Sequence, residues 1–212
     1  MGLVALGSGG EVIANVAVRT GFPAIDKEWP AVAEQADRVA FVLGKLSLHL
    51  PLGFERISVS QDQVTDPRPY IMALDYPGDR RISIAWVGKD YANLLDEILG
   101  VVNADPRRYF DLVFGANPEA PPPEASSEHV LWQDALETRR LLFATGSNPA
   151  RYVSDSASAY VADTGTHLSA RMFVVDHENR LNVLEILARG FDSSDLARLL
   201  GSISSPKDAV DQ

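Results

Sequence analysis

The residues with the most obvious potential for chemistry are four histidines and their acidic neighbours. The histidines are His49, His129, His167 and His177. None shows the His-x-His or His-Glu-x-x-His spacing that is typical of a metal site. Asp176, His177 and Glu178 are three consecutive potential ligands, but adjacent strand residues point to opposite faces and a polar turn uses the same residue types. We therefore interpret 176–179 as a turn.

One other metal arrangement stays open. Asp163, His167 and Asp176 would converge if the hairpin that contains Asp176 folded over the preceding strand. Tight binding of zinc or manganese that His167→Ala abolishes would establish it.

Nucleophile and phosphate motifs are absent from the sequence. There is no cysteine, which excludes disulfides, thiolate nucleophiles and Cys-based zinc sites, and no Gly-x-Ser-x-Gly pentad. Gly7 and Gly9 fit the first two places of Gly-x-Gly-x-x-Gly, but Val12 occupies the third. A phosphate loop would also need a cation where Glu11 stands, so 6–12 is predicted to be a hairpin turn. The sequence assigns no catalytic residue, cofactor or metal, and it favours a protein that is not an enzyme.

Paired charges are interpreted as surface features. Asp96 and Glu97 are expected on the solvated side of a helix. The arginine doublets at 80–81, 107–108 and 139–140 lack the interleaved aromatics that single-stranded nucleic acid prefers, so we expect them to pair with the chain's own carboxylates. Of the aromatics, Trp29, Trp86 and Trp132 are expected in the core. Tyr76, beside a turn proline, is expected to be exposed and able to anchor a partner.

The first half of the chain predicts a helix, a strand, a hairpin and a second helix. Three-and-four spacing of apolar residues predicts a helix between Asp26 and Leu50, and 54–60 alternates like a strand. Strands around 70–74 and 82–86 flank the turn at 75–79. Asp90 is expected to cap the next helix. The core face of that helix is Leu94, Leu95, Ile98 and Val102.

The second half repeats this order. Ser126 or Ser127 is expected to cap a helix that Gly146 ends, and its core face is Val130, Leu131, Ala135, Thr138 and Leu142. A looser strand region follows at 151–163. Strands at 170–176 and 181–188 form a hairpin. The final helix begins with Asp192 as its cap and Asp195 three residues on, which resembles a capping box.

These patterns predict an α+β fold of two pseudo-repeated helix–strand–hairpin–helix units, with a mostly antiparallel sheet and helices packed on it. The predicted divisions are an N-terminal unit at 1–116 with a leading hairpin, a Pro-rich linker at 117–127, a C-terminal unit at 128–204 and a flexible tail at 205–212. A short helix is expected around Tyr109, Phe110 and Val113. We expect the two units to form one compact body.

Composition narrows the classes of partner. The 212 residues carry a formal net charge of −10, which gives the chain no electrostatic reason to bind nucleic acid or an anionic membrane and favours a basic partner. The N-terminal apolar run is interrupted by Gly9, Gly10 and Glu11, so no transmembrane or secretory segment is expected. We expect a cytoplasmic protein.

Three functions fit these observations. The first is a non-catalytic module that holds a polypeptide partner, in the manner of a secretion chaperone or a toxin-immunity protein. The order helix, three strands, helix is loosely similar to small secretion-chaperone domains, a likeness of topology that rests on no motif. The second is a structural or assembly subunit of a phage or secretion apparatus, for which a homodimer is one possible state. The third is an enzyme with a dispersed site.

Overall fold

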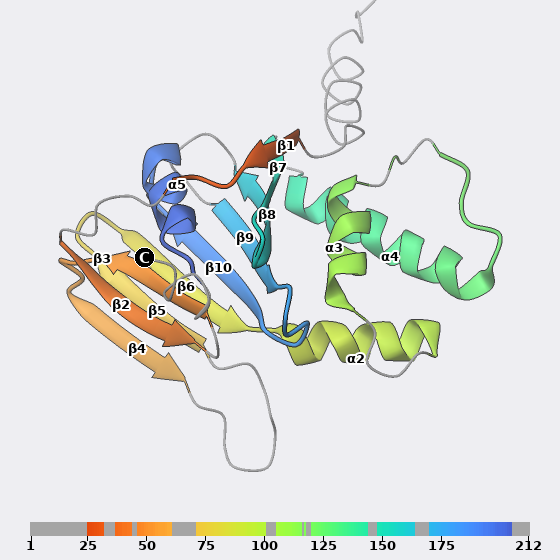
Figure 1. Ribbon diagram of the computed structural model, residues 1–212, viewed down its shortest axis with the longest axis horizontal. Coiled ribbons are helices and arrows are strands. Elements are labelled where there is room, and N and C mark those ends of the chain that lie inside the picture. Colours follow the sequence, from red (N-terminus) through yellow and green to blue (C-terminus); the bar gives the residue numbers. More distant parts are fainter. Residues whose placement is uncertain are drawn as a thin grey trace, which may run out of the picture.

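The computed structural model describes residues 25–31, 37–43, 46–60, 71–100, 105–115, 117, 120–143, 148–163 and 170–204. These residues form a mixed α+β fold with four helices and a large, mostly antiparallel sheet (Figure 1). The predicted turn at 6–12, the predicted helix end at Gly146 and the histidine His167 lie outside the described residues.

Eight strands form the main sheet, and only the β1–β7 pair is parallel. Their order across the sheet is β1 (Ile25–Glu28), β7 (Asn148–Val153), β8 (Ala157–Asp163), β9 (Ala170–Asp176), β10 (Val183–Arg189), β6 (Arg80–Trp86), β5 (Ile71–Tyr76) and β4 (Arg56–Ser60). The two predicted hairpins, β5–β6 and β9–β10, are confirmed. They join edge to edge through β6 and β10, where Ile84 lies opposite Ile186.

One face of this sheet is covered by a β-hairpin and a helix. Strands β2 (Arg38–Leu43) and β3 (Leu46–Pro51) form the hairpin, and α5 (Ser193–Gly201) lies beside β3. Leu46, Leu48 and Leu50 alternate along β3 and are fully buried against the sheet. Successive side chains of a strand point to opposite faces, so every second residue of β3 points towards the main sheet. We call the hydrophobic core between the sheet and this hairpin the first core.

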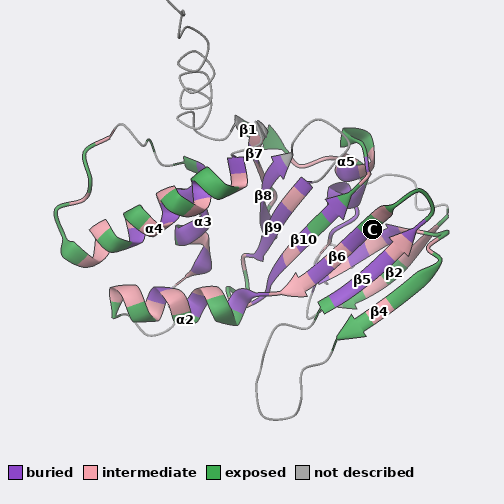
Figure 2. Cartoon of the chain, turned by 180° about the vertical axis from the view of Figure 1, so that it is seen from behind, coloured by how far each residue is buried: buried purple, intermediate pink, exposed green. Residues whose placement is uncertain are grey.

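On the other face, three helices cover the part of the sheet formed by β8, β9 and β10: α2 (Gly88–Leu99), α3 (Pro106–Gly115) and α4 (Ser126–Phe143) (Figures 1 and 2). Their core is rich in aromatic rings. Phe110 of α3 lies at its centre and stacks on Phe173 of β9 with ring centroids 4.6 Å apart. The predicted short helix around Phe110 is confirmed as α3.

The helix predicted between Asp26 and Leu50 is wrong. The described residues of this segment form β1, β2 and β3 instead. The spacing of apolar residues in this segment is compatible with a helix and also with strands. The strands form because they bury Leu46, Leu48 and Leu50 on one face. The predicted strand at 54–60 is confirmed as β4, although it is more exposed than the half-buried strand we expected.

Predicted helix ends agree with the structure in some places and differ in others. Asp192 caps α5 by accepting from the backbone N–H groups of Ser194 and Asp195, both at 2.8 Å. Asp90, by contrast, lies inside the first turn of α2, whose N-cap is Val87 and has no side-chain cap bond. Helix α4 begins at Ser126, but Val130, which we placed on its core face, is exposed. The buried residues of α4 are Leu131, Ala135, Arg139 and Phe143.

The pseudo-repeat is not confirmed. The described residues between Asp26 and Leu50 form strands and not the predicted opening helix, and the strand region predicted at 151–163 consists of two strands, β7 and β8. The domain divisions at 116, 127 and 204 stay predictions. Within the part of the chain that the structure describes, no helix combines the length and the apolar character needed to cross a membrane.

Candidate functional site

The outer edge of β4 is the most unusual surface of the sheet. β4 is the last strand in the order, and no described strand pairs with its outer side. Ile57 and Val59 lie opposite Leu74 and Met72 of β5, so they continue the row of side chains that forms the first core. Yet Ile57 is 43 % exposed and Val59 is 50 % exposed. An apolar row thus continues out of the core to an edge that no other described strand covers.

The opposite edge of the same sheet is built differently. β1 has the sequence Ile-Asp-Lys-Glu, and its three charged residues are exposed. Asp26 also receives a two-pronged ion pair from Arg151, with N–O distances of 2.8 and 3.0 Å. Charged residues on an edge strand disfavour the addition of another strand. β4 has no proline, and its only charged residue is Arg56 at its first position.

Apolar exposure extends around β4. Leu52, just before β4, is half exposed, and Ile71 of the neighbouring β5 is exposed on the opposite sheet face. Phe54 is partly buried and meets the ring of Tyr76 edge-on, at 6.2 Å between centroids. The burial colouring in Figure 2 shows β4 mostly exposed while β5 beside it is largely buried. A strand that pairs with β4 would place apolar side chains beside Ile57 and Val59.

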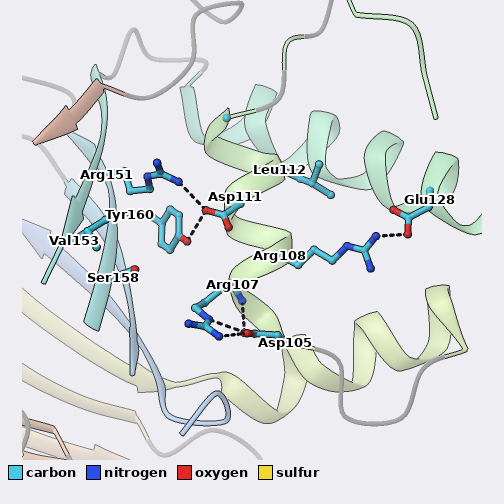
Figure 3. Close-up of a pocket in the computed structure, with 11 residues that line it drawn as sticks. Asp105, Arg107, Arg108, Asp111, Leu112, Glu128, Arg151, Val153, Ser158 and Tyr160 are labelled. Carbon is cyan, nitrogen blue, oxygen red and sulfur yellow. Dashed lines mark hydrogen bonds and ion pairs between the residues drawn. The ribbon is translucent and has the colours of Figure 1, made fainter. Parts of the chain in front are cut away.

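A polar cavity of about 850 Å³ lies at the other side of the molecule, between α3 and the strands β7 and β8 (Figure 3). Three arginines, Arg107, Arg108 and Arg151, and three carboxylates line it. Arg107 pairs with Asp105, Arg108 with Glu128 and Arg151 with Asp111. The cavity walls therefore carry no unbalanced charge. Its uncharged lining residues are Leu112, Gly115, Val153, Ser158 and Tyr160.

The ion pair with Arg107 stabilises the charged form of Asp105. Burial acts to raise the pKa of Asp105, but the hydrogen bonds from the side chain and backbone of Arg107 outweigh it and hold that pKa below its ordinary value. Burial, together with the neighbouring carboxylate of Asp111, raises the pKa of Tyr160. Tyr160 therefore stays a hydroxyl at neutral pH and donates to Asp111 at 2.8 Å.

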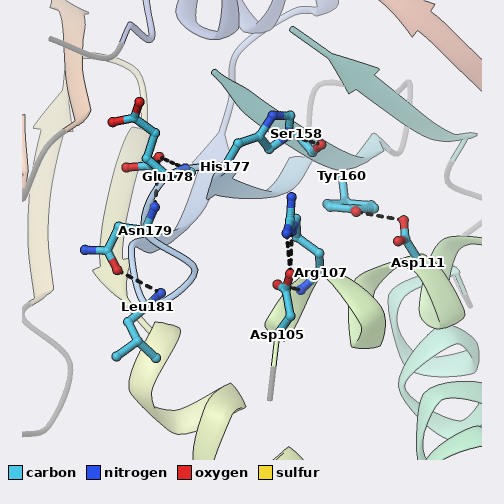
Figure 4. Close-up of polar contacts among 10 residues, drawn as sticks. Asp105, Arg107, Asp111, Ser158, Tyr160, His177, Glu178, Asn179 and Leu181 are labelled. Carbon is cyan, nitrogen blue, oxygen red and sulfur yellow. Dashed lines mark hydrogen bonds and ion pairs between the residues drawn. The ribbon is translucent and has the colours of Figure 1, made fainter. Parts of the chain in front are cut away.

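Ser158 and His177 form a hydrogen-bonded pair at one wall of this cavity (Figure 4). The Ser158 Oγ lies 2.8 Å from Nε2 of His177, and Nδ1 of His177 lies 3.1 Å from the carbonyl oxygen of Asp155. A carbonyl oxygen only accepts, so Nδ1 carries the ring proton. In the neutral ring Nε2 then accepts, and the Ser158 hydroxyl is the donor.

The metal arrangement left open by the sequence includes His167, which lies outside the described residues, so it stays a hypothesis. Asp176 is buried at the end of β9, where its carboxylate accepts from the backbone N–H groups of Glu178 and Asn179 and from the side chain of Asn182. This is the turn that we predicted at 176–179. In the described ranges there is no group of three acidic, histidine or cysteine side chains that could hold a metal ion.

The arginine doublets mostly pair with the chain's own carboxylates. Besides the pairs in the cavity, Arg81 contacts Asp75 at 3.4 Å and Arg140 contacts Glu137 at 3.3 Å. Arg139 is an exception because it is buried, and it donates to the carbonyl of Val113 at 2.7 Å. Arg80 lies over the Phe191 ring, with its guanidinium carbon 5.3 Å from the centroid.

The three tryptophans and Tyr76, for which the sequence analysis made predictions, differ in how far they are buried. Trp29 and Trp86 are partly buried and pack against the first core, and Trp132 is half-buried beside His129. The expectation for Tyr76 is wrong. It lies on the core face of β5, is 4 % exposed and donates its hydroxyl to the carbonyl of Pro51 at 3.0 Å. Burial raises the pKa of Tyr76 to about 12.

Comparison with family models, with curated proteins and with solved structures gives no match to this chain. The functional argument therefore rests on the chain's own geometry. Sequence reasoning identified the β4 strand but not its place at the edge, and it missed the Ser158–His177 pair. The only sequence signal for that pair is two polar residues at the ends of neighbouring strands.

Proposed function

We propose that this chain is a polypeptide-binding protein that accepts an extended segment of a partner as an additional strand beside β4. The observation that carries the proposal is the apolar row of Ile57 and Val59 on a strand whose outer edge is unpaired among the described residues. In strand addition, backbone hydrogen bonds supply affinity, and alternate side chains supply specificity.

The chemistry of the partner follows from the same features. Apolar residues at every second position would lie beside Ile57 and Val59 and extend the first core. The net charge of −10 attracts basic segments over long range. We therefore infer that the partner segment is extended, alternates apolar and polar residues, and is basic. A ten-residue peptide of alternating valine and lysine has this chemistry and is the probe for the tests.

Val59→Lys is expected to lower the affinity for this peptide at least about tenfold, which corresponds to about 1.4 kcal/mol. The substitution places a charge on the apolar row, where it repels the peptide and must be desolvated when a strand is added. The affinity would be measured by fluorescence anisotropy of the labelled peptide. Because Val59 is half exposed, the folded protein tolerates the change, which a thermal melt would verify.

Val42→Lys is the matched control. Val42 is 72 % exposed on β2, a strand that also has an unpaired edge among the described residues, and the change of charge is the same. The proposal requires that this variant binds as the wild type does. Equal weakening by both variants would show a general charge effect. Light scattering would show whether the wild-type protein forms a dimer. A dimer that forms through β4 and does not bind the peptide would mean that the partner is a second copy of the chain and not a foreign polypeptide.

A further inference from the structure

The geometry points to a second activity, separate from the β4 edge: we propose that Ser158 is a nucleophile activated by His177 and that the adjoining cavity binds a small uncharged carboxylic ester. Ser158 lines the cavity, and its hydroxyl donates to Nε2 of His177 at 2.8 Å. The Asp155 carbonyl holds the other ring nitrogen at 3.1 Å. An activated serine needs a base within hydrogen-bond distance and a third group that orients this base. Here His177 is the base and the Asp155 carbonyl orients it.

Local structure holds these parts in place. Ser158 lies in β8 and His177 directly follows β9, and the pairing of Ala157 with Asp176 brings their backbones together. The backbone N–H of His177 donates to the carbonyl of Ser156 at 2.9 Å. Ser154 closes the preceding turn by accepting from the N–H of Ala157 at 3.0 Å. The pair is therefore built on rigid backbone, as a catalytic group requires.

The cavity selects the class of substrate. Its volume of about 850 Å³ is within the usual range for a small-molecule site. Its three arginines are matched by three carboxylates, so a charged substrate gains no net attraction. Leu112 and Val153 offer apolar contact for an acyl chain. These features favour a neutral ester of modest size.

The reaction uses only these groups and water. The Ser158 Oγ forms a bond to the ester carbonyl carbon while its proton moves to Nε2 of His177. The bond from that carbon to the alkoxy oxygen then breaks, and His177 returns the proton to the departing alcohol. Water attacks the acyl-serine with His177 again as the base, which releases the carboxylic acid and restores Ser158. Arg107 lines the same cavity as Ser158, and we assign to it the stabilisation of the transient oxyanion.

Diisopropyl fluorophosphate tests this inference directly, because it modifies activated serines and spares ordinary ones. Full-length protein would be treated at neutral pH, and the modified residue identified by mass spectrometry of its peptides. We expect Ser158 to be modified stoichiometrically, with fluoride as the leaving group, and the protein to hydrolyse p-nitrophenyl acetate. His177→Gln is expected to slow the modification by at least about a hundredfold.

Two controls separate catalysis from a structural role. Ser158→Ala must abolish both modification and hydrolysis, whereas Ser83→Ala, in β6 and outside the lining of the cavity, must preserve them. Modification of Ser158 at the same rate in wild type and His177→Gln would overturn the inference, as would wild-type Ser158 that reacts no faster than the other serines. The rate at which Ser158 of the wild-type protein reacts, compared with the other serines, tests the inference even if a variant fails to fold. Peptide binding at β4 is measured separately, so the two proposals fail independently.

Discussion

Phe110→Ala is expected to lower the free energy of unfolding by about 3–5 kcal/mol, the range typical for truncation of a buried phenylalanine. Phe110 is 1 % exposed, and its ring contacts aromatic rings from α2, α3, β8 and β9. The nearest are Phe173 at 4.6 Å and Tyr91 at 4.8 Å between centroids. Removing the ring leaves a cavity that these rigid neighbours fill poorly. Urea unfolding, followed by circular dichroism, measures the change.

Leu141→Ala provides the comparison, because Leu141 is 72 % exposed on α4. Its unfolding free energy should stay within about 0.5 kcal/mol of the wild type. A loss for Phe110→Ala that is equally small would mean that α3 does not pack on the sheet as described.

Gly88→Ala is expected to destabilise the protein by about 3 kcal/mol, at the upper end of the usual cost of overpacking. Gly88 begins α2, and a Cβ atom there would lie 2.1 Å from the carbonyl oxygen of Leu181. That oxygen is held in place, because it accepts from the indole N–H of Trp86 at 3.0 Å. The clash is therefore between two backbone segments that cannot both stay where they are.

Gly115→Ala is the matched control at the end of α3. A Cβ atom at Gly115 meets nothing within 4 Å, and alanine is the better helix former by up to about 1 kcal/mol. Melting temperatures should fall for Gly88→Ala and stay level or rise for Gly115→Ala. The same melting temperature for both variants would contradict the contact between the start of α2 and the β9–β10 turn.

The sequence predicted best the elements whose signals are local. The β5–β6 and β9–β10 hairpins follow from alternation around polar turns, and in the first turn Gly78 and Asp79 adopt positive φ angles of 74° and 57°. Helix α5 was predicted from Asp192, whose cap bonds lie within three residues. Each of these features needs no information from distant parts of the chain.

The failed predictions depend on distant contacts. Residues 38–50 fall within the predicted helix, although they form a hairpin that is stabilised by packing on the main sheet and by the pairing of Ser47 with Ser204, 157 residues away. Tyr76 was expected at the surface because of its turn, but its position on the core face of β5 decides its burial. The contact of Ser47 with Ser204 leaves no trace in apolar spacing, whereas Tyr76 continues the alternation of Met72 and Leu74 along β5, a local signal that the adjoining turn obscured.

The candidate sites were hidden for the same reason. β4 is an edge only because the two hairpins join through β6 and β10, whose residues are about a hundred positions apart in the chain. Ser158 and His177 are 19 residues apart and meet through the register of β8 with β9. Side-chain type singled out His177 as a potential metal ligand, but it did not indicate the partner Ser158 or the edge position of β4.

Hydrogen exchange of the β4 amides tests the central claim most directly. The full-length protein would be compared with and without a saturating concentration of the alternating valine–lysine peptide, by mass spectrometry of fragments that cover residues 56–60. The account predicts slower exchange in β4, because a new strand hydrogen-bonds its outward N–H groups, and no change in β1. The same peptide with every amide nitrogen methylated must give no protection. Unchanged exchange in β4 at saturation, or equal protection by the methylated peptide, would contradict strand addition.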